Sequence, residues 1–232
     1  MKTSPLSYDL APESPFGYAC HRCGKCCHHQ RITLAPYELL RLARGLGLST
    51  GEFIERHTVA GGTRLRFDGP AGACSLLKEN GCSAHADRPL ACRLYPLGGR
   101  FVSDGQARFA QITPHPESAG VYGDAGTVGE FIAAQEIAPF LEASSRYEAL
   151  FDRLLGLLAR YLGRQATVST EEPLALPLDP LPASSWFDID AVLIEWRTRR
   201  GLAIPETLEA QMDLHLSAMN AWAEDLARLL DR

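Results

Sequence analysis

The stretch CHRCGKCC, residues 20–27, holds four of the seven cysteines of this 232-residue chain within eight positions. The other three are Cys74, Cys82 and Cys92. An odd number of cysteines argues against a framework of disulfides. The adjacent thiols of Cys26 and Cys27 also cannot easily form a disulfide with each other. The cysteine pattern therefore predicts a metal site built from thiolates.

The spacing inside this stretch suits metal binding. In a Cys-x2-Cys turn, two thiolates converge on one centre while backbone N–H groups point at the sulfurs. Gly24 permits the positive φ that such a turn often requires. The interval of three between Cys20, Cys23 and Cys26 is the interval that bacterial ferredoxins use for three of their cluster ligands.

Two later elements supply the remaining thiols. Asn80-Gly81 predicts a tight turn that presents Cys82, eight residues after Cys74. Cys92 lies in DRPLACRLYP, where two prolines bracket a short, stiff segment. The metal site is thus expected to draw on three separate parts of the chain.

The number of thiols is compatible with more than one kind of metal site. One [4Fe–4S] cluster takes four thiolates and leaves three, which with a histidine could hold a second metal. Two zinc ions that share one thiolate would instead use all seven cysteines. Among the histidines near the cysteines, His21 and His85 are the preferred additional ligands, because each lies within three residues of a cysteine.

Charge and composition restrict the class of protein. Hydrophobic residues make up 46% and charged residues 22% of the chain, which is typical of a globular protein. Residues 1–100 contain 13 Lys and Arg against 8 Asp and Glu, and residues 101–232 contain 10 against 20. We expect the arginines around the cysteines to compensate thiolate charge, with an anionic-substrate site as the alternative. Basic and aromatic residues do not interleave, so nucleic-acid binding is not expected.

The sequence also indicates where in the cell the protein is expected. No apolar run approaches the length of a membrane span, so no membrane association is expected. The first twenty residues are interrupted by prolines and lack a hydrophobic region, which is unlike a secretory signal. We therefore expect a cytoplasmic protein with an unidentified protein or redox partner.

The cysteine stretches, followed by the segment RITLAPYELLRLARGLGLSTGEFIERHT and by DRPLACRLYP, resemble the CxxCxxCC (YkgJ-type) cysteine-cluster family over about residues 16–100. Members of that family are described as zinc- or iron-chelating domains and are often called iron–sulfur-cluster proteins. The family often has Cys-Pro-Phe-Leu where this chain has Cys74-Ser75-Leu76-Leu77, a change that keeps the thiol. A flagellin lysine-N-methylase carries a similar cluster, so the resemblance also admits an enzyme. The resemblance implies a metal-binding set of Cys20, Cys23, Cys26, Cys27, Cys74, Cys82 and Cys92.

The remaining sequence predicts an α+β protein with a helical C-terminal segment. A cysteine-cluster domain is expected over residues 16–124 and a helical region over 125–232, with a proline-rich connector at 166–187. Pro36 and the capping box of Ser49 predict two helices, which we expect to brace the metal site. Capping boxes are also expected at Thr127 and Ser145, a β-hairpin around Asp104-Gly105, and final helices at about 188–200 and 205–231.

The function predicted from the sequence is metal binding. The leading interpretation is an iron–sulfur protein, most simply with a [4Fe–4S] cluster, and zinc or iron ions are the alternative. A structural zinc module that supports protein–protein interaction is the rival from another class. A metal-dependent modifying enzyme of the lysine-methylase type is a third reading, which rests on the resemblance alone.

Overall fold

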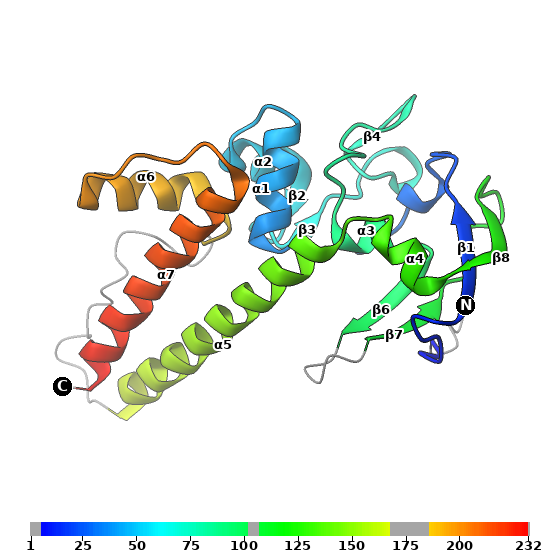
Figure 1. Ribbon diagram of the computed structural model, residues 1–232. Coiled ribbons are helices and arrows are strands. Elements are labelled where there is room, and N and C mark those ends of the chain that lie inside the picture. Colours follow the sequence, from blue (N-terminus) through cyan, green and yellow to red (C-terminus); the bar gives the residue numbers. More distant parts are fainter. Residues whose placement is uncertain (1–5, 102–106, 168–185, 232) are drawn as a thin grey trace. The chain divides into compact units, whose positions relative to one another are not determined.

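A computed structural model describes residues 6–101, 107–167 and 186–231 (Figure 1). Helices are mixed with short antiparallel strands, and the C-terminal part is helical, which confirms the predicted α+β class. The chain forms two compact units, of which unit 1 comprises Met1–Thr33 with Leu65–Phe140 and unit 2 comprises Leu34–Arg64 with Leu141–Arg232. The predicted division at residue 124 stays a prediction, and most of the predicted connector lies outside the described residues.

Unit 1 is built from strand pairs and short helices. Strand β1 (Pro15–Ala19) pairs with β8 (Val121–Thr127), β4 (Leu77–Lys78) with β5 (Gly81–Cys82), and β6 (Leu97–Phe101) with β7 (Ala107–Gln111), all antiparallel. The last pair confirms the two strands of the predicted hairpin, whose turn lies outside the described residues. The helical segments are η1 (Lys25–Cys27), η2 (Pro70–Gly72), α3 (Leu90–Leu94) and α4 (Val128–Ala133).

One apolar cluster of unit 1 packs around four buried side chains. It gathers the buried residues Phe16, Leu97, Phe109 and Val128 from four different elements. The ring of Phe131 packs edge-on against that of Phe16 at a centroid distance of 5.1 Å. Helix α4 begins at the predicted capping box, where the Glu130 amide donates to the Thr127 hydroxyl over 3.2 Å. Other buried apolar side chains of unit 1, among them Leu76, Ala84 and Leu94, lie next to the cysteines in the sequence.

Unit 2 is mainly helical. Its elements are α1 (Pro36–Gly45), α2 (Thr50–His57), most of α5 (Ala138–Thr167), α6 (Ile189–Arg200) and α7 (Leu208–Leu230), and the short strands β2 (Thr58–Val59) and β3 (Arg64–Leu65) follow α2. The predicted helix starts at Pro36 and Ser49 are confirmed. The start predicted at Ser145 is wrong, because α5 already runs from Ala138. The apolar spacing of Phe140, Ala143 and Tyr147 continues the buried stripe upstream of that serine.

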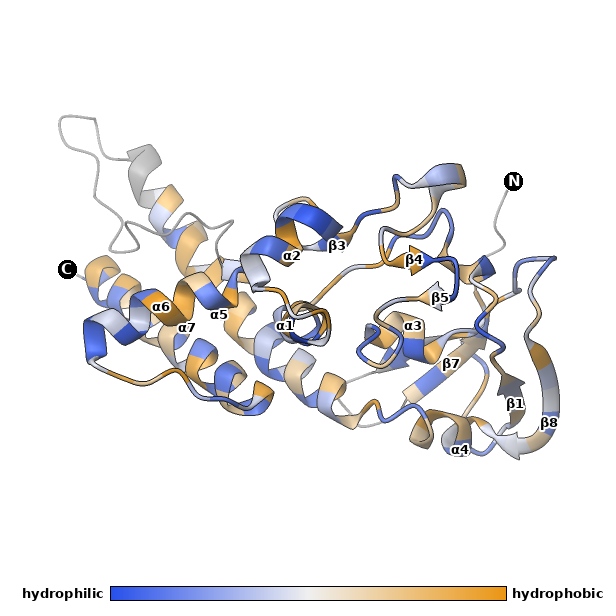
Figure 2. Cartoon of the chain, turned by 90° about the horizontal axis from the view of Figure 1, so that it is seen from above, coloured by the Kyte–Doolittle hydropathy of each residue, from blue (hydrophilic) through white to orange (hydrophobic). Residues whose placement is uncertain are grey.

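Helices α1 and α2 pack on the C-terminal helices of unit 2. Leu40 of α1 forms a buried cluster with Ile189 and Leu193 of α6. Hydrophobic and hydrophilic residues alternate along α1, α5 and α7, as expected for helices with one buried face (Figure 2). Met212 and Met219 of α7 lie in this core, with exposed fractions of 4% and 1%. The predicted role of the 36–57 helices as a brace for the metal site stays a prediction.

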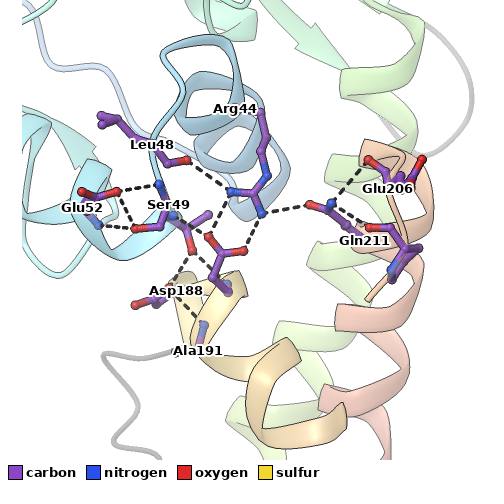
Figure 3. Close-up of polar contacts among 11 residues, drawn as sticks. Arg44, Leu48, Ser49, Glu52, Asp188, Ala191, Glu206 and Gln211 are labelled. Atoms are coloured by element: carbon purple, nitrogen blue, oxygen red, sulfur yellow. Dashed lines mark hydrogen bonds and ion pairs between the residues drawn. The ribbon is translucent and has the colours of Figure 1, made fainter. Parts of the chain in front are cut away.

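A polar network ties α1, α2, α6 and α7 together (Figure 3). The Arg44 guanidinium donates to an Asp190 carboxylate oxygen over 3.0 Å and to the Gln211 side-chain oxygen over 3.0 Å. The Thr50 amide donates to the same carboxylate over 2.8 Å, and the Thr50 hydroxyl donates to Asp188 over 2.6 Å. The carboxylate of Asp190 therefore holds together two helix starts that are 140 residues apart in the chain.

We expect Asp190→Ala to destabilise unit 2 by about 2 kcal/mol, because it leaves a guanidinium and a helix-start amide without their acceptor. Urea unfolding followed by the helical dichroism measures this loss. Asp225→Ala is the matched control, since Asp225 pairs with Arg228 in a solvent-exposed contact on α7 and should contribute no more than about 0.5 kcal/mol. Equal losses in the two variants would contradict the role of the network.

A buried histidine lies between α5 and α7. His215 is fully buried, and its ring Nδ1 lies 2.9 Å from the hydroxyl oxygen of Tyr147, which is 2% exposed. Burial lowers the pKa of His215 to about 4 from its usual 6.5. The sequence placed this residue on a helix but carried no sign of its burial.

This histidine makes the stability of unit 2 depend on pH. The unfolded chain binds the His215 proton near pH 6.5 and the folded chain only near pH 4, so acid favours unfolding. The free energy of unfolding should be highest above pH 6.5 and should fall by about 1.4 kcal/mol per pH unit below it. Urea unfolding at pH 7 and pH 5 should differ by about 2 kcal/mol more in the wild type than in His215→Leu. The same pH dependence in both proteins would refute this prediction.

Candidate metal centre

The stretch of residues 20–27, here called the cysteine knuckle, turns at Gly24. This glycine has a φ of 74°, which confirms the predicted positive φ, and its carbonyl accepts the Cys27 amide over 2.9 Å. A Cβ atom at this position would lie 2.9 Å from Cδ1 of Leu77. The glycine thus serves both the turn and the close packing of the knuckle against the β4–β5 hairpin.

Backbone hydrogen bonds join the knuckle to the second group of cysteines. The Cys74 amide donates to the Cys27 carbonyl over 2.8 Å, and the His29 amide donates to the Gly72 carbonyl over 2.9 Å. Gly81, with a φ of 97°, forms the predicted turn before Cys82. These contacts bring two regions of the chain that lie about fifty residues apart to one place.

The structure gathers five thiols, those of Cys26, Cys27, Cys74, Cys82 and Cys92, near one another. A hydrogen bond between the two adjacent thiols lowers the pKa of Cys26 to about 7 and raises that of Cys27, which Cys82 and Cys92 raise further. Burial, and then the proximity of the other thiols, raises the pKa of Cys74 and of Cys82. These thiols lie close enough to oppose one another's ionisation, so a bound cation would stabilise them as thiolates.

The other two thiols lie at the surface. Cys20 and Cys23 are exposed, whereas Cys74 is buried. The sulfur of Cys20 accepts the Arg22 amide at 3.5 Å, and that of Cys23 accepts the Ala119 amide at 3.4 Å. Backbone N–H groups of Lys25 and Ala119 lower the pKa of Cys23, because they stabilise its thiolate. None of the seven cysteines, all of which lie in described ranges, forms a disulfide.

The two histidines proposed as extra ligands make other contacts in this structure. The Nδ1 atom of His21 lies 2.6 Å from the carbonyl oxygen of Ala119. The Nδ1 atom of His85 lies 3.2 Å from the Arg88 guanidinium. Burial and nearby guanidinium groups lower the pKa of His85, so its ring is held neutral. Metal ligation by either histidine stays a prediction.

The cations near the thiols have two different roles. The positive charge of Arg88 favours the thiolate form of Cys82 and opposes the rise of its pKa, as expected for charge compensation. Arg93 is buried and holds the chain instead: it donates to the Arg88 carbonyl over 3.0 Å and to the Gln135 carbonyl over 2.9 Å. The two arginines thereby shape the loop that leads from Cys82 to α3, which carries Cys92.

Residues other than the cysteines complete the surroundings. Tyr18, two residues before Cys20, and Tyr95, three residues after Cys92, lie beside the thiols with ring centroids 6.1 Å apart. Ser118 and Ala119 contact the knuckle from the connection between β7 and β8, and Gln135 binds both arginines of the neighbouring loop. No motif pointed to Ser118, Ala119 or Gln135, because their position depends on chain contacts across more than forty residues.

The donor set fits zinc or iron, although the thiols are not arranged as a closed coordination sphere. Thiolates are the ligands that zinc and iron–sulfur clusters prefer. Within the described ranges, however, no group of three or more Cys, His, Asp or Glu side chains has the spacing to hold a metal ion. The thiols are thus brought near one another from three segments, and binding a metal requires them to close further.

Comparison with known proteins agrees with the chemistry of the thiols. Residues 19–114 match the model of the CxxCxxCC family, whose description is "Putative zinc- or iron-chelating domain". Neither the curated proteins nor the solved structures contain a significant match to the chain. None of the helices in the described ranges combines the length and hydropathy that a membrane span requires. The matched residues 19–114 contain all seven cysteines of the chain.

Proposed function

We propose that this protein binds an iron–sulfur cluster through its cysteines. The observation that carries the proposal is the convergence of Cys26, Cys27, Cys74, Cys82 and Cys92 from three segments of unit 1. Cys20 and Cys23 extend this set at the surface. When bound, such a cluster would supply one-electron chemistry. The chain's own residues would hold the cluster and limit its contact with water.

Two features favour a cluster over zinc alone. The interval of three between Cys20, Cys23 and Cys26 is the ferredoxin interval, and seven thiols exceed the four that one structural zinc needs. Backbone N–H groups also hydrogen-bond the sulfurs of Cys23, Cys74 and Cys82. Such bonds are among the levers that tune the reduction potential of iron–sulfur clusters.

A structural zinc module is the second candidate. It is supported by the short turns and two-residue strands that carry the cysteines of unit 1, which a structural metal would hold together. In that case unit 1 would present a rigid surface to a partner protein. With a cluster, the partner would instead be a redox protein, and the chain would act in a reducing compartment such as the cytoplasm.

Anaerobic purification of the untagged protein, followed by metal and sulfide analysis and a visible spectrum, separates these functions. An iron–sulfur protein should contain about four iron and four sulfide per cluster and absorb at about 400 nm. One or two zinc per chain without sulfide would contradict the iron–sulfur cluster and would support the structural zinc site instead. Protein that contains neither metal, even after anaerobic reconstitution with iron, sulfide or zinc, would overturn the proposed function.

A further inference from the structure

A short segment, about ninety residues further along the chain, lies on the cysteine knuckle. This segment, His115–Gly120 and here called the strap, connects β7 to β8. Its Glu117 carboxylate lies 2.5 Å from the ammonium group of Lys25. Its Ala119 contacts the knuckle through both backbone groups, with the carbonyl 2.6 Å from the His21 ring and the amide 3.4 Å from the sulfur of Cys23.

The strap has a defined shape of its own. The Ser118 amide donates to the His115 carbonyl over 2.8 Å, and the Glu117 amide donates to Nδ1 of the His115 ring over 3.1 Å. The Ser118 hydroxyl accepts the Gly120 amide over 3.2 Å, and its proximity helps to lower the pKa of Cys23. The strap is thus a folded turn that presents the Ala119 amide to one sulfur. It begins one residue after the end of the segment that matches the CxxCxxCC family.

The strap meets the knuckle where metal exchange would begin. Cys20 and Cys23 are the two exposed thiols, while the others are buried or half-buried. A chelator or an acceptor protein would therefore reach Cys20 and Cys23 first. Among the contacts that dock the strap, the ion pair of Lys25 with Glu117 is exposed, and such a pair contributes about 1 kcal/mol at most.

We propose that the strap controls metal exchange at the knuckle by positioning the Cys23 sulfur. In the docked state the Ala119 amide holds this sulfur as a metal ligand and covers one side of it. In the undocked state the sulfur loses that hydrogen bond and becomes open to a competing ligand. This role rests on the proposed metal-binding function and adds to it a route by which the metal enters and leaves.

Gly120 offers a precise way to weaken docking. A Cβ atom on Gly120 would lie 2.0 Å from the hydroxyl oxygen of Tyr18 and 2.3 Å from Cζ of its ring. Tyr18 cannot easily turn away, because its ring packs against those of Tyr95 and Tyr122 at 6.1 and 5.2 Å. Gly120→Ala should therefore displace the strap. Gly123→Ala is the matched control, since a Cβ atom there meets nothing within 4 Å.

The test measures the rate at which metal-loaded protein releases its metal to a chelator in excess. Loss of an outer partner of a metal ligand typically weakens binding about 10–100-fold, so Gly120→Ala should release metal at least about tenfold faster than the wild type. Glu117→Gln, an exposed change that should not affect folding, should release it about twofold to fivefold faster. Gly123→Ala should match the wild type.

Hydrogen exchange supplies a readout that does not depend on release. With metal bound, the amides of residues 115 and 117–120 should exchange faster in Gly120→Ala and Glu117→Gln than in Gly123→Ala. Equal release rates in all four proteins, or faster release without any change in strap exchange, would overturn the role of the strap. A wild type that binds no metal would overturn the proposed function itself, and the role of the strap with it.

Discussion

Removing the metal should unfold the cysteine-bearing part of unit 1 and leave the helices of unit 2 intact. Thiolate–metal bonds contribute about 10–16 kcal/mol in small zinc modules, which equals or exceeds the whole stability of a typical domain. The cysteine turns of unit 1 have little regular structure to replace them, because η1 is three residues long and β4 and β5 are two residues long each. Unit 2 contains long helices with a continuous apolar core.

Hydrogen exchange with and without a chelator tests this expectation region by region. The amides of Cys27 and Cys74, which are hydrogen-bonded to Gly24 and Cys27, should lose their protection when the metal is removed. Amides of α1, α6 and α7 should keep theirs, and most of the helical dichroism should remain. Unchanged protection at Cys27 and Cys74 after complete metal removal would show that unit 1 is stable without metal.

Cys26→Ser should reduce metal binding more than any single substitution of a residue that is not a cysteine. Cys26 lies closest to the centre of the thiol group, because its sulfur affects the ionisation of Cys27, Cys74 and Cys82. Loss of a partner outside the ligand shell costs about 10–100-fold in metal affinity, so loss of a ligand should cost at least about 100-fold. Metal content per chain after reconstitution, and competition with a chelator of known affinity, measure the effect.

The control for this experiment is Glu79→Gln. Glu79 is exposed at the turn of the β4–β5 hairpin, beside the thiol site but with its side chain at the surface. It should keep the metal content and the affinity of the wild type. If Cys26→Ser bound metal as tightly as Glu79→Gln, Cys26 would not be a ligand, and the centre of the site would have to be sought among the remaining thiols.

Much of the local structure around the site was predictable from sequence. The positive φ of Gly24, the turn at Gly81 and the helix starts at Pro36 and Ser49 all appeared where expected. Each depends on chemistry within about four residues: the missing Cβ of glycine, the fixed φ of proline and a side chain that accepts its own helix's amide. The error at Ser145 has the same origin, since a capping pattern cannot show that a helix has already begun.

What the sequence by itself determined is the presence and spacing of seven thiols, a type of donor that prefers zinc and iron–sulfur clusters. Only the tertiary structure placed Cys26 among the thiols of three segments, brought Ala119 to the sulfur of Cys23 across 96 residues and buried His215 beside Tyr147. Such contacts follow from how whole elements pack, and the free energy of that packing is shared among many residues. Local patterns carry no record of it.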